Sequence, residues 1–170
     1  MKTLYVTDLD GTLLRTDDTV SPFTINTVNG LVDKGMLFTY ATARSLVSAS
    51  VVTRGLSARI PVIAYNGAFI YNAETGIPLY SLFFTPEESA FIISLLQSFR
   101  LYPFVYSFQE GIERLSWMSG TENEGCFNYL RKRKGDPRLN PVSDEKRLYA
   151  GDIFYFTCIG EKEALQPFYE

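Results

Sequence analysis

The sequence predicts an α/β protein in which a parallel, doubly wound sheet is followed by an α+β segment. Short β-rich, apolar runs alternate with helix-like segments over the first eighty residues, an order typical of parallel sheets with right-handed crossovers. Beyond this stretch the alternation gives way to hairpin-like pairs of runs. We therefore expect two domains, residues 1–82 and residues 83–170.

The first part is expected to contain three parallel strands joined by two helices. Buried parallel strands are short and apolar, and three runs share this pattern: residues 3–7, 36–41 and 61–65. The first helix is predicted to begin after Ser21, an N-cap residue that is followed by proline, and to stop at Gly35. The second is predicted to run from Leu46 to about Gly55.

From residue 68 onward the sequence predicts a mixture of hairpins and helices. Strand-like runs are expected at residues 68–72, 77–83, 102–108, 112–118 and 152–159. Thr85 opens a capping box with proline at the first helical position, which predicts a helix to about Phe99. A second capping box is expected at Thr121, with its helix ending at Gly135, and a last helix begins at Glu161.

Composition and charge exclude several classes of protein. The 170 residues are 46% hydrophobic, a composition typical of globular proteins. The net charge of −3 argues against a basic nucleic-acid-binding protein. The absence of histidine excludes Ser-His-Asp catalysis and His-ligated zinc, and Cys126 and Cys158 form no CxxC motif. No apolar run suits a membrane span or a signal peptide. We therefore expect a soluble cytoplasmic protein with no nucleic-acid or membrane partner.

Two carboxylates, Asp8 and Asp10, directly follow the first strand in the stretch DLDGTLL. Ligands of open α/β sheets bind outside the carboxyl ends of the strands. There, one carboxylate can attack phosphorus while the other gives or takes a proton at the ester oxygen. A hard cation such as Mg²⁺ would offset their repulsion, and Gly11 would let the backbone turn towards phosphate. On spacing alone, a solvated acidic turn is an equal alternative.

The stretch DLDGTLL after an N-terminal hydrophobic strand resembles motif one of the haloacid dehalogenase-type phosphatases. The second strand ends in Ala41-Thr42-Ala43-Arg44, which is similar to the ATGR of the Cof-like branch, with alanine in place of the usual glycine. The third strand ends in Asn66-Gly67-Ala68, which resembles the NGA of that branch. Each match lies at the carboxyl end of a successive strand, so the resemblance covers the first 70 residues specifically.

This resemblance implies a Mg²⁺-dependent phosphatase that acts on a small phosphorylated metabolite through an aspartyl-phosphate. Asp8 would be the nucleophile and a metal ligand, and Asp10 would be the general acid/base, with its backbone carbonyl also on the metal. The positions implied to contact phosphate or substrate are Gly11, Thr12, Thr42, Arg44, Asn66 and Gly67. Taken singly, Thr42 and Asn66 are also common capping or turn residues, and Arg44 has an alternative as a solvated side chain.

The chain departs from the family's pattern towards its end. The motif-three lysine and the acidic motif four of the family follow the cap, and Gly151-Asp152 resembles the acidic motif but has no second acid after it. The resemblance therefore implies an apparently truncated chain: part of a Rossmannoid core at 1–82 and an incomplete α/β cap at 83–170. The alternatives are a non-catalytic fragment that binds a partner or self-associates through an exposed core edge, and a phosphosugar mutase-like relative.

Overall fold

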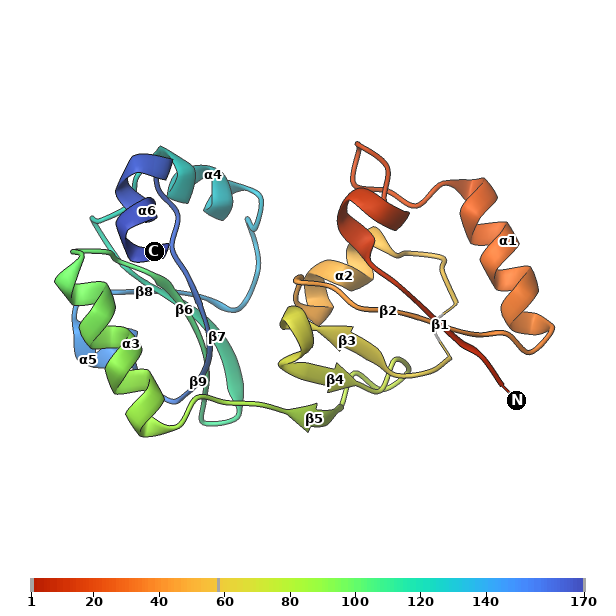
Figure 1. The fold of residues 1–170 in the computed structure, drawn as a ribbon, viewed down its shortest axis with the longest axis horizontal. Helices are drawn as coiled ribbons and strands as arrows, with labels where there is room; N and C mark the ends of the chain where they lie inside the picture. Colours follow the sequence, from red (N-terminus) through yellow and green to blue (C-terminus); the bar gives the residue numbers. More distant parts are fainter. Residues whose placement is uncertain (1, 58, 170) are drawn as a thin grey trace. The chain divides into compact units, whose positions relative to one another are not determined.

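The computed structural model describes every residue except 1, 58 and 170. The chain divides into two compact units, Met1–Leu82 (unit 1) and Phe83–Glu170 (unit 2), each built from helices and strands (Figure 1). A parallel strand pair lies in unit 1 and a mainly antiparallel sheet in unit 2, so the predicted α/β class with an α+β segment is confirmed. No helix among the described residues is long and apolar enough to cross a membrane.

Unit 1 opens with a β-α-β arrangement. Strands β1 (Leu4–Thr7) and β2 (Leu37–Tyr40) pair in parallel, and helix α1 (Pro22–Asp33) connects them. The hydroxyl of Ser21 accepts a hydrogen bond from the backbone N–H of Thr24, so the predicted cap forms. This crossover brings the carboxyl ends of β1 and β2 to the same edge.

A second crossover continues through helix α2 (Leu46–Val52) to strand β3 (Val62–Ala64). A single parallel bridge, Ala41 to Ile63, joins the end of β2 to β3. Beyond that bridge, β3 pairs in antiparallel fashion with β4 (Phe69–Tyr71), and β4 pairs with β5 (Pro78–Ser81). The predicted order of strands and helices along the chain is correct. However, β3 is only three residues long, and its hydrogen bonds are made mainly with the antiparallel strand β4 rather than with β2.

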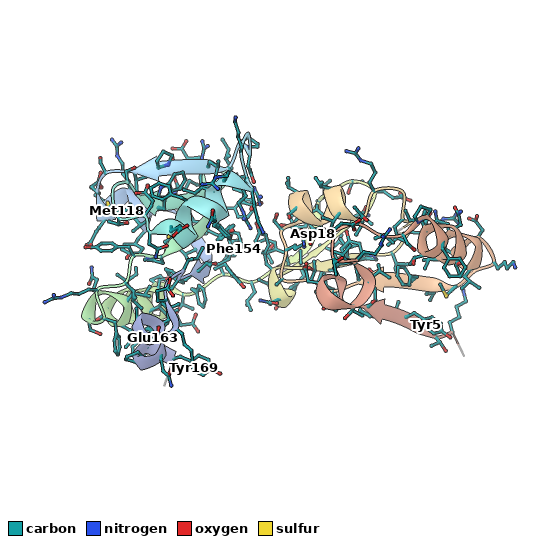
Figure 2. All side chains as sticks on the ribbon, turned by 90° about the horizontal axis from the view of Figure 1, so that it is seen from above. Tyr5, Asp18, Met118, Phe154, Glu163 and Tyr169 are labelled. Carbon is teal, nitrogen blue, oxygen red and sulfur yellow. The ribbon has the colours of Figure 1, made fainter. Side chains whose placement is uncertain are left out.

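Strand β1 lies at an edge, because within the part of the chain that the structure describes it pairs with β2 alone. Its residues Leu4, Tyr5 and Val6 are 52%, 54% and 49% exposed, so both faces of the strand meet solvent. In Figure 2 the labelled Tyr5 side chain extends outward from the ribbon. By contrast, Phe38 and Tyr40 of β2 are buried. The strand that leads to Asp8 is therefore covered much less than its partner.

Unit 2 is a four-stranded sheet with helices on both faces. Its strands, in the order β8-β7-β6-β9, are β6 (Phe104–Gln109), β7 (Ile112–Met118), β8 (Leu139–Val142) and β9 (Asp152–Thr157). Its helices are α3 (Pro86–Ser98), α4 (Glu124–Arg131), α5 (Glu145–Leu148) and α6 (Lys162–Tyr169). Helices α3 and α5 lie side by side (Figure 1), and Leu148 packs into the core with Val105 and Ile153. The neighbouring β6 residue Phe104 points the other way, with its ring 5.0 Å from that of Tyr129 in α4.

A buried arginine joins the two strands β7 and β8 of unit 2. Arg138 is 6% exposed, and its guanidinium donates to Asp136 through Nε (2.9 Å to Oδ1) and Nη2 (2.6 Å to Oδ2). Its Nη1 donates to Glu113 Oε1 at 2.6 Å. These bonds to Arg138 hold the pKa of Asp136 below its ordinary value, against an opposing effect of burial. The buried guanidinium is thus paired with a carboxylate on each side, as a buried positive charge requires.

The second predicted capping box is wrong. Helix α4 begins two residues later than expected, with Asn123 as its N-cap accepting from the backbone N–H of Cys126 at 2.9 Å. Glu122 accepts a hydrogen bond from Trp117 Nε1 at 2.7 Å, and the hydroxyl of Thr121 donates to the carbonyl of Met118 rather than capping a helix. Contacts with strand β7 thus displace the local capping pattern.

Candidate active site

The segment after β1 forms a tight turn over Leu9–Leu13, which is closed by a hydrogen bond from the N–H of Leu14 to the carbonyl of Leu9 at 2.9 Å. Gly11 takes a φ of +75° there, a left-handed conformation that glycine adopts without strain, so the predicted turn at this residue is confirmed. Leu9 is completely buried and Asp8 and Asp10 on either side of it are exposed. The buried leucine therefore anchors the turn while both carboxylates stay accessible.

A pocket of about 260 Å³ lies where β1, β2 and β3 end. It is lined by Asp8, Ala41, Thr42, Ala43, Ile63, Asn66 and Gly67. Four of the predicted site residues (Asp8, Thr42, Asn66 and Gly67) are thus brought together. The others, Asp10, Gly11, Thr12 and Arg44, are not part of this lining.

Thr42 links the ends of two strands beneath the pocket. It is 3% exposed; its N–H donates to the carbonyl of Ile63 at 3.0 Å, and its own carbonyl accepts from the N–H of Asn66 at 3.0 Å. The hydroxyl Oγ1 accepts from the backbone N–H of Arg44 at 3.1 Å. Because that contact uses an oxygen lone pair, the hydroxyl hydrogen is left to donate to a ligand in the pocket.

Replacing Thr42 with valine should therefore harm both stability and any phosphate chemistry. The loss of the acceptor for the Arg44 N–H should cost about 1–2 kcal/mol of unfolding free energy, and loss of a hydrogen bond to a charged phosphoryl group should slow turnover roughly tenfold. Thr42→Ser keeps the hydroxyl and is the matched control. Urea unfolding and aryl-phosphate assays measure the two effects; equal turnover by the valine and serine variants would contradict a role for the hydroxyl.

Three consecutive residues after β3 adopt the left-handed backbone region. The φ values of Tyr65, Asn66 and Gly67 are +51°, +56° and +95°. Such a conformation is unusual for a bulky residue and persists only where the surroundings enforce it. Tyr65 is buried, donates its N–H to the carbonyl of Arg44 at 3.0 Å and packs its ring edge-on against Phe69 at 5.9 Å. Tyr65 thus sets the direction of the Asn66–Gly67 turn, a role that has no distinct sequence signal.

The predicted substrate residue Arg44 is engaged by carboxylates. Its Nε donates to Asp10 Oδ2 at 2.8 Å, its Nη2 to Asp10 Oδ1 at 2.6 Å, and the same Nη2 to Asp18 Oδ1 at 3.2 Å. These bonds to Arg44 hold the pKa of Asp10 below its usual value. Asp10 is therefore ionised near neutral pH, the form that can accept a proton. Sequence reasoning missed Asp18, which is part of a plain acidic loop, TDDT.

Comparison with known proteins identifies the family. A family model described as haloacid dehalogenase-like hydrolase matches residues 5–166. The chain belongs to this family. The family membership that the resemblance of DLDGTLL and of the two later strand ends implied is thereby confirmed.

Individual relatives of this haloacid dehalogenase-like hydrolase match only in part. Over 71 residues it is 35% identical to 5-amino-6-(5-phospho-D-ribitylamino)uracil phosphatase YitU of Bacillus subtilis, covering 42% of this chain and 26% of the relative. Over 93 residues it is 31% identical to HMP-PP phosphatase of Yersinia pestis, covering 55% of this chain and 34% of the relative. The matched segments thus span about a third or less of these curated relatives.

Solved structures show the same fold over nearly the whole chain. TM0651 from Thermotoga maritima matches with a TM-score of 0.70 at 24% identity, and SMU.1108c from Streptococcus mutans with 0.74 at 18%. Each match covers 98% of this chain and 60% of the other. At these identities the likeness shows the fold alone.

The family implies a Mg²⁺ ion, and the donors at the end of β1 suit one. Mg²⁺ prefers oxygen ligands and keeps several waters. The exposed carboxylate of Asp8 and the backbone carbonyl of Asp10 are such donors, whereas the Asp10 carboxylate is bound to Arg44. Among the described residues there is no cluster of three or more His, Cys, Asp or Glu side chains placed to hold a metal. The donor set therefore fits a sparsely ligated, largely hydrated ion.

Proposed function

We propose that this chain carries the phosphoryl-transfer site of a phosphatase that acts on a small phosphorylated metabolite. The observation that supports it is the pocket at three strand ends, where Asp8 lies with Thr42 and the Asn66–Gly67 turn. In this proposal unit 1 is part of the catalytic core and unit 2 is the cap that selects the substrate. Both curated relatives described above are named as phosphatases, of different phosphorylated compounds.

The proposed reaction has two steps. First, a carboxylate oxygen of Asp8 attacks phosphorus and the ester P–O bond breaks. Asp10, which is ionised at rest, must first take up a proton from solvent, and it passes this proton to the departing alcohol oxygen. Then Asp10 takes a proton from water, whose oxygen displaces Asp8 from phosphorus and releases inorganic phosphate. The Thr42 hydroxyl and the backbone of the Asn66–Gly67 turn would hold the phosphoryl oxygens in place.

In this proposal the Asp8 carboxylate and the Asp10 carbonyl hold the Mg²⁺ ion. When bound, the ion offsets the charge that the nucleophile and the phosphate bring together. The chain's own contribution is positional, because buried Leu9 and the turn at Gly11 fix where both aspartates stand.

The test is Mg²⁺-dependent release of phosphate from p-nitrophenyl phosphate by the 170-residue chain, with and without EDTA. Mass spectrometry after rapid acid quenching would look for one phosphoryl group on the peptide that contains Asp8. Release that requires Mg²⁺ and a phosphorylated Asp8 peptide would support the proposal. Folded protein that shows neither would overturn it for this chain.

The open edge of β1 favours a second candidate function, a binding protein that associates with itself. Half-exposed Leu4, Tyr5 and Val6 offer apolar contacts, and an unpaired strand edge is a template for another strand. Replacing Val6 with lysine should then convert a concentration-dependent oligomer into a monomer, because a charge on the edge opposes pairing. Sedimentation equilibrium measures this; a wild-type chain that stays monomeric at high concentration would rule the candidate out.

A further inference from the structure

The loop at residues 15–19 is tied to the candidate active site through one side chain. Asp18 accepts a hydrogen bond from Nη2 of Arg44, the same nitrogen that donates to Asp10. Asp18 and Arg44 are 26 residues apart in the sequence, so the fold rather than a local turn makes this contact. We propose that Asp18 is a positioning residue. By accepting a hydrogen bond from Nη2, Asp18 restrains the Arg44 guanidinium so that Nε and Nη2 hold the Asp10 carboxylate in one orientation.

Hydrogen bonds hold the backbone of Arg44 in place, so only the orientation of its side chain is left to be set. Its N–H donates to the Thr42 hydroxyl, and its carbonyl accepts from the N–H of Tyr65. The guanidinium is planar, with its donors in a rigid fork. Two parallel bonds to Asp10 therefore require one orientation of the plane, and a third acceptor at the edge restricts rotation of that plane further.

The loop presents Asp18 in a defined place. The N–H of Arg15 donates to the carbonyl of Thr19 at 2.9 Å, and the N–H of Asp18 donates to the carbonyl of Arg15 at 3.0 Å. The neighbouring Asp17 accepts from both the N–H and the hydroxyl of Thr19. Asp17 thus closes the loop upon itself, while the carboxylate of Asp18 (labelled in Figure 2) reaches out to Arg44.

Asp18 keeps a left-handed backbone, with a φ of +58°. Aspartate tolerates this region better than most residues, and glycine adopts it freely. Asp18→Gly therefore removes the carboxylate without straining the loop. Because the Asp18 side chain is 65% exposed, the contact should contribute little to global stability, and its effect should lie in the orientation of Arg44.

The experiment compares Asp18→Gly with the matched control Asp17→Asn, which keeps the acceptor for Thr19. The readout is hydrogen exchange of the Arg44 Nε–H by NMR, its signal assigned by its loss in Arg44→Lys. We expect exchange to rise about threefold in Asp18→Gly, the size typical of one exposed charged contact, and to stay unchanged in Asp17→Asn. The melting temperature of Asp18→Gly should match wild type; if that variant does not fold, Asp18→Asn should show a smaller rise.

This inference rests on the proposed function only for its catalytic consequence. If the wild type is active, kcat of Asp18→Gly should fall about threefold with KM unchanged, because substrate binding groups are intact. Faster exchange at Arg44 in an inactive wild type would support the positioning contact and count against the proposed function alone. Unchanged exchange in Asp18→Gly, whatever the activity, would overturn the role of Asp18.

Discussion

Replacing Asp8 with asparagine is expected to abolish Mg²⁺-dependent phosphate release, lowering the rate at least about 10³-fold. The amide has nearly the same shape as the carboxylate but is a far poorer nucleophile, and it carries no charge for a metal ion. Asp8 lines the pocket and is exposed on an anchored turn, so the substitution should leave the fold intact. Phosphate release from p-nitrophenyl phosphate, measured at saturating Mg²⁺, checks the result.

Two comparisons make the Asp8 experiment specific. Asp17→Asn changes another exposed carboxylate of unit 1, one that accepts from Thr19 outside the pocket, and should keep wild-type turnover. Circular dichroism should show the same fold for all three proteins. If Asp8→Asn retained an appreciable part of the wild-type rate, a different group would have to be the nucleophile.

Replacing Arg138 with methionine is expected to destabilise unit 2 by about 3–5 kcal/mol, because Glu113 and Asp136 would lose the guanidinium that offsets their charges in a mostly buried place. Both carboxylates are mostly shielded from solvent where Arg138 bonds them. Domains are commonly stable by about 5–15 kcal/mol, so such a loss is a large fraction of the total. Urea unfolding of the complete chain, followed by the fluorescence of Trp117, measures it.

The matched control for Arg138 is Arg147→Met, which removes an exposed arginine from its ion pair with Asp144. Surface pairs contribute roughly 0–1 kcal/mol, so this variant should unfold almost like the wild type. Equal urea midpoints for Arg138→Met and Arg147→Met would show that the ion pairs of Arg138 with Glu113 and Asp136 contribute little to the free energy of unfolding.

The Arg138 network should also make stability depend on pH in a specific direction. Arg138 lowers the pKa of Asp136 in the folded state from its ordinary value of 3.8, so the stabilisation is complete above that value. It is lost as the pH falls through the lower folded pKa, because protonation removes the charge that Arg138 binds. The difference in unfolding free energy between wild type and Arg138→Met should therefore narrow below about pH 3.8. A constant difference in acid would contradict this account.

Sequence patterns could predict the parts of the fold that depend on local signals. Ser21 before proline and the capping box at Thr85 mark helix starts that the structure retains. The short elements β8 and α5 were not expected, because Pro141 interrupts the strand pattern and α5 is only four residues long. Helix ends were also misplaced, since α2 stops at Val52 rather than near Gly55.

The candidate site also contains one part that the sequence could predict and one part that it could not. Asp8, Thr42, Asn66 and Gly67 each follow a strand, and parallel strands bring their carboxyl ends to one edge, so their meeting in a pocket follows from topology. The pairing of Arg44 with Asp10 and Asp18 spans 34 and 26 residues and depends on the exact path of two loops. No local pattern encodes such a contact. The placement of Arg44 at the phosphate or substrate comes from the family resemblance and stays a prediction.

The open edge of β1 should make this strand open more often than the rest of unit 1. Strand β1, which ends one residue before Asp8, is hydrogen-bonded on one side only within the described chain, and Leu4, Tyr5 and Val6 are about half exposed. Segments with few buried contacts open locally at a lower free energy than the rest of a domain. Each opening of β1 would carry Asp8 away from Thr42, so the fraction of time in which the two stand together is governed by fraying of this strand. A partner that covered the edge would hold Asp8 beside Thr42 for longer, and assembly would then regulate the proposed reaction.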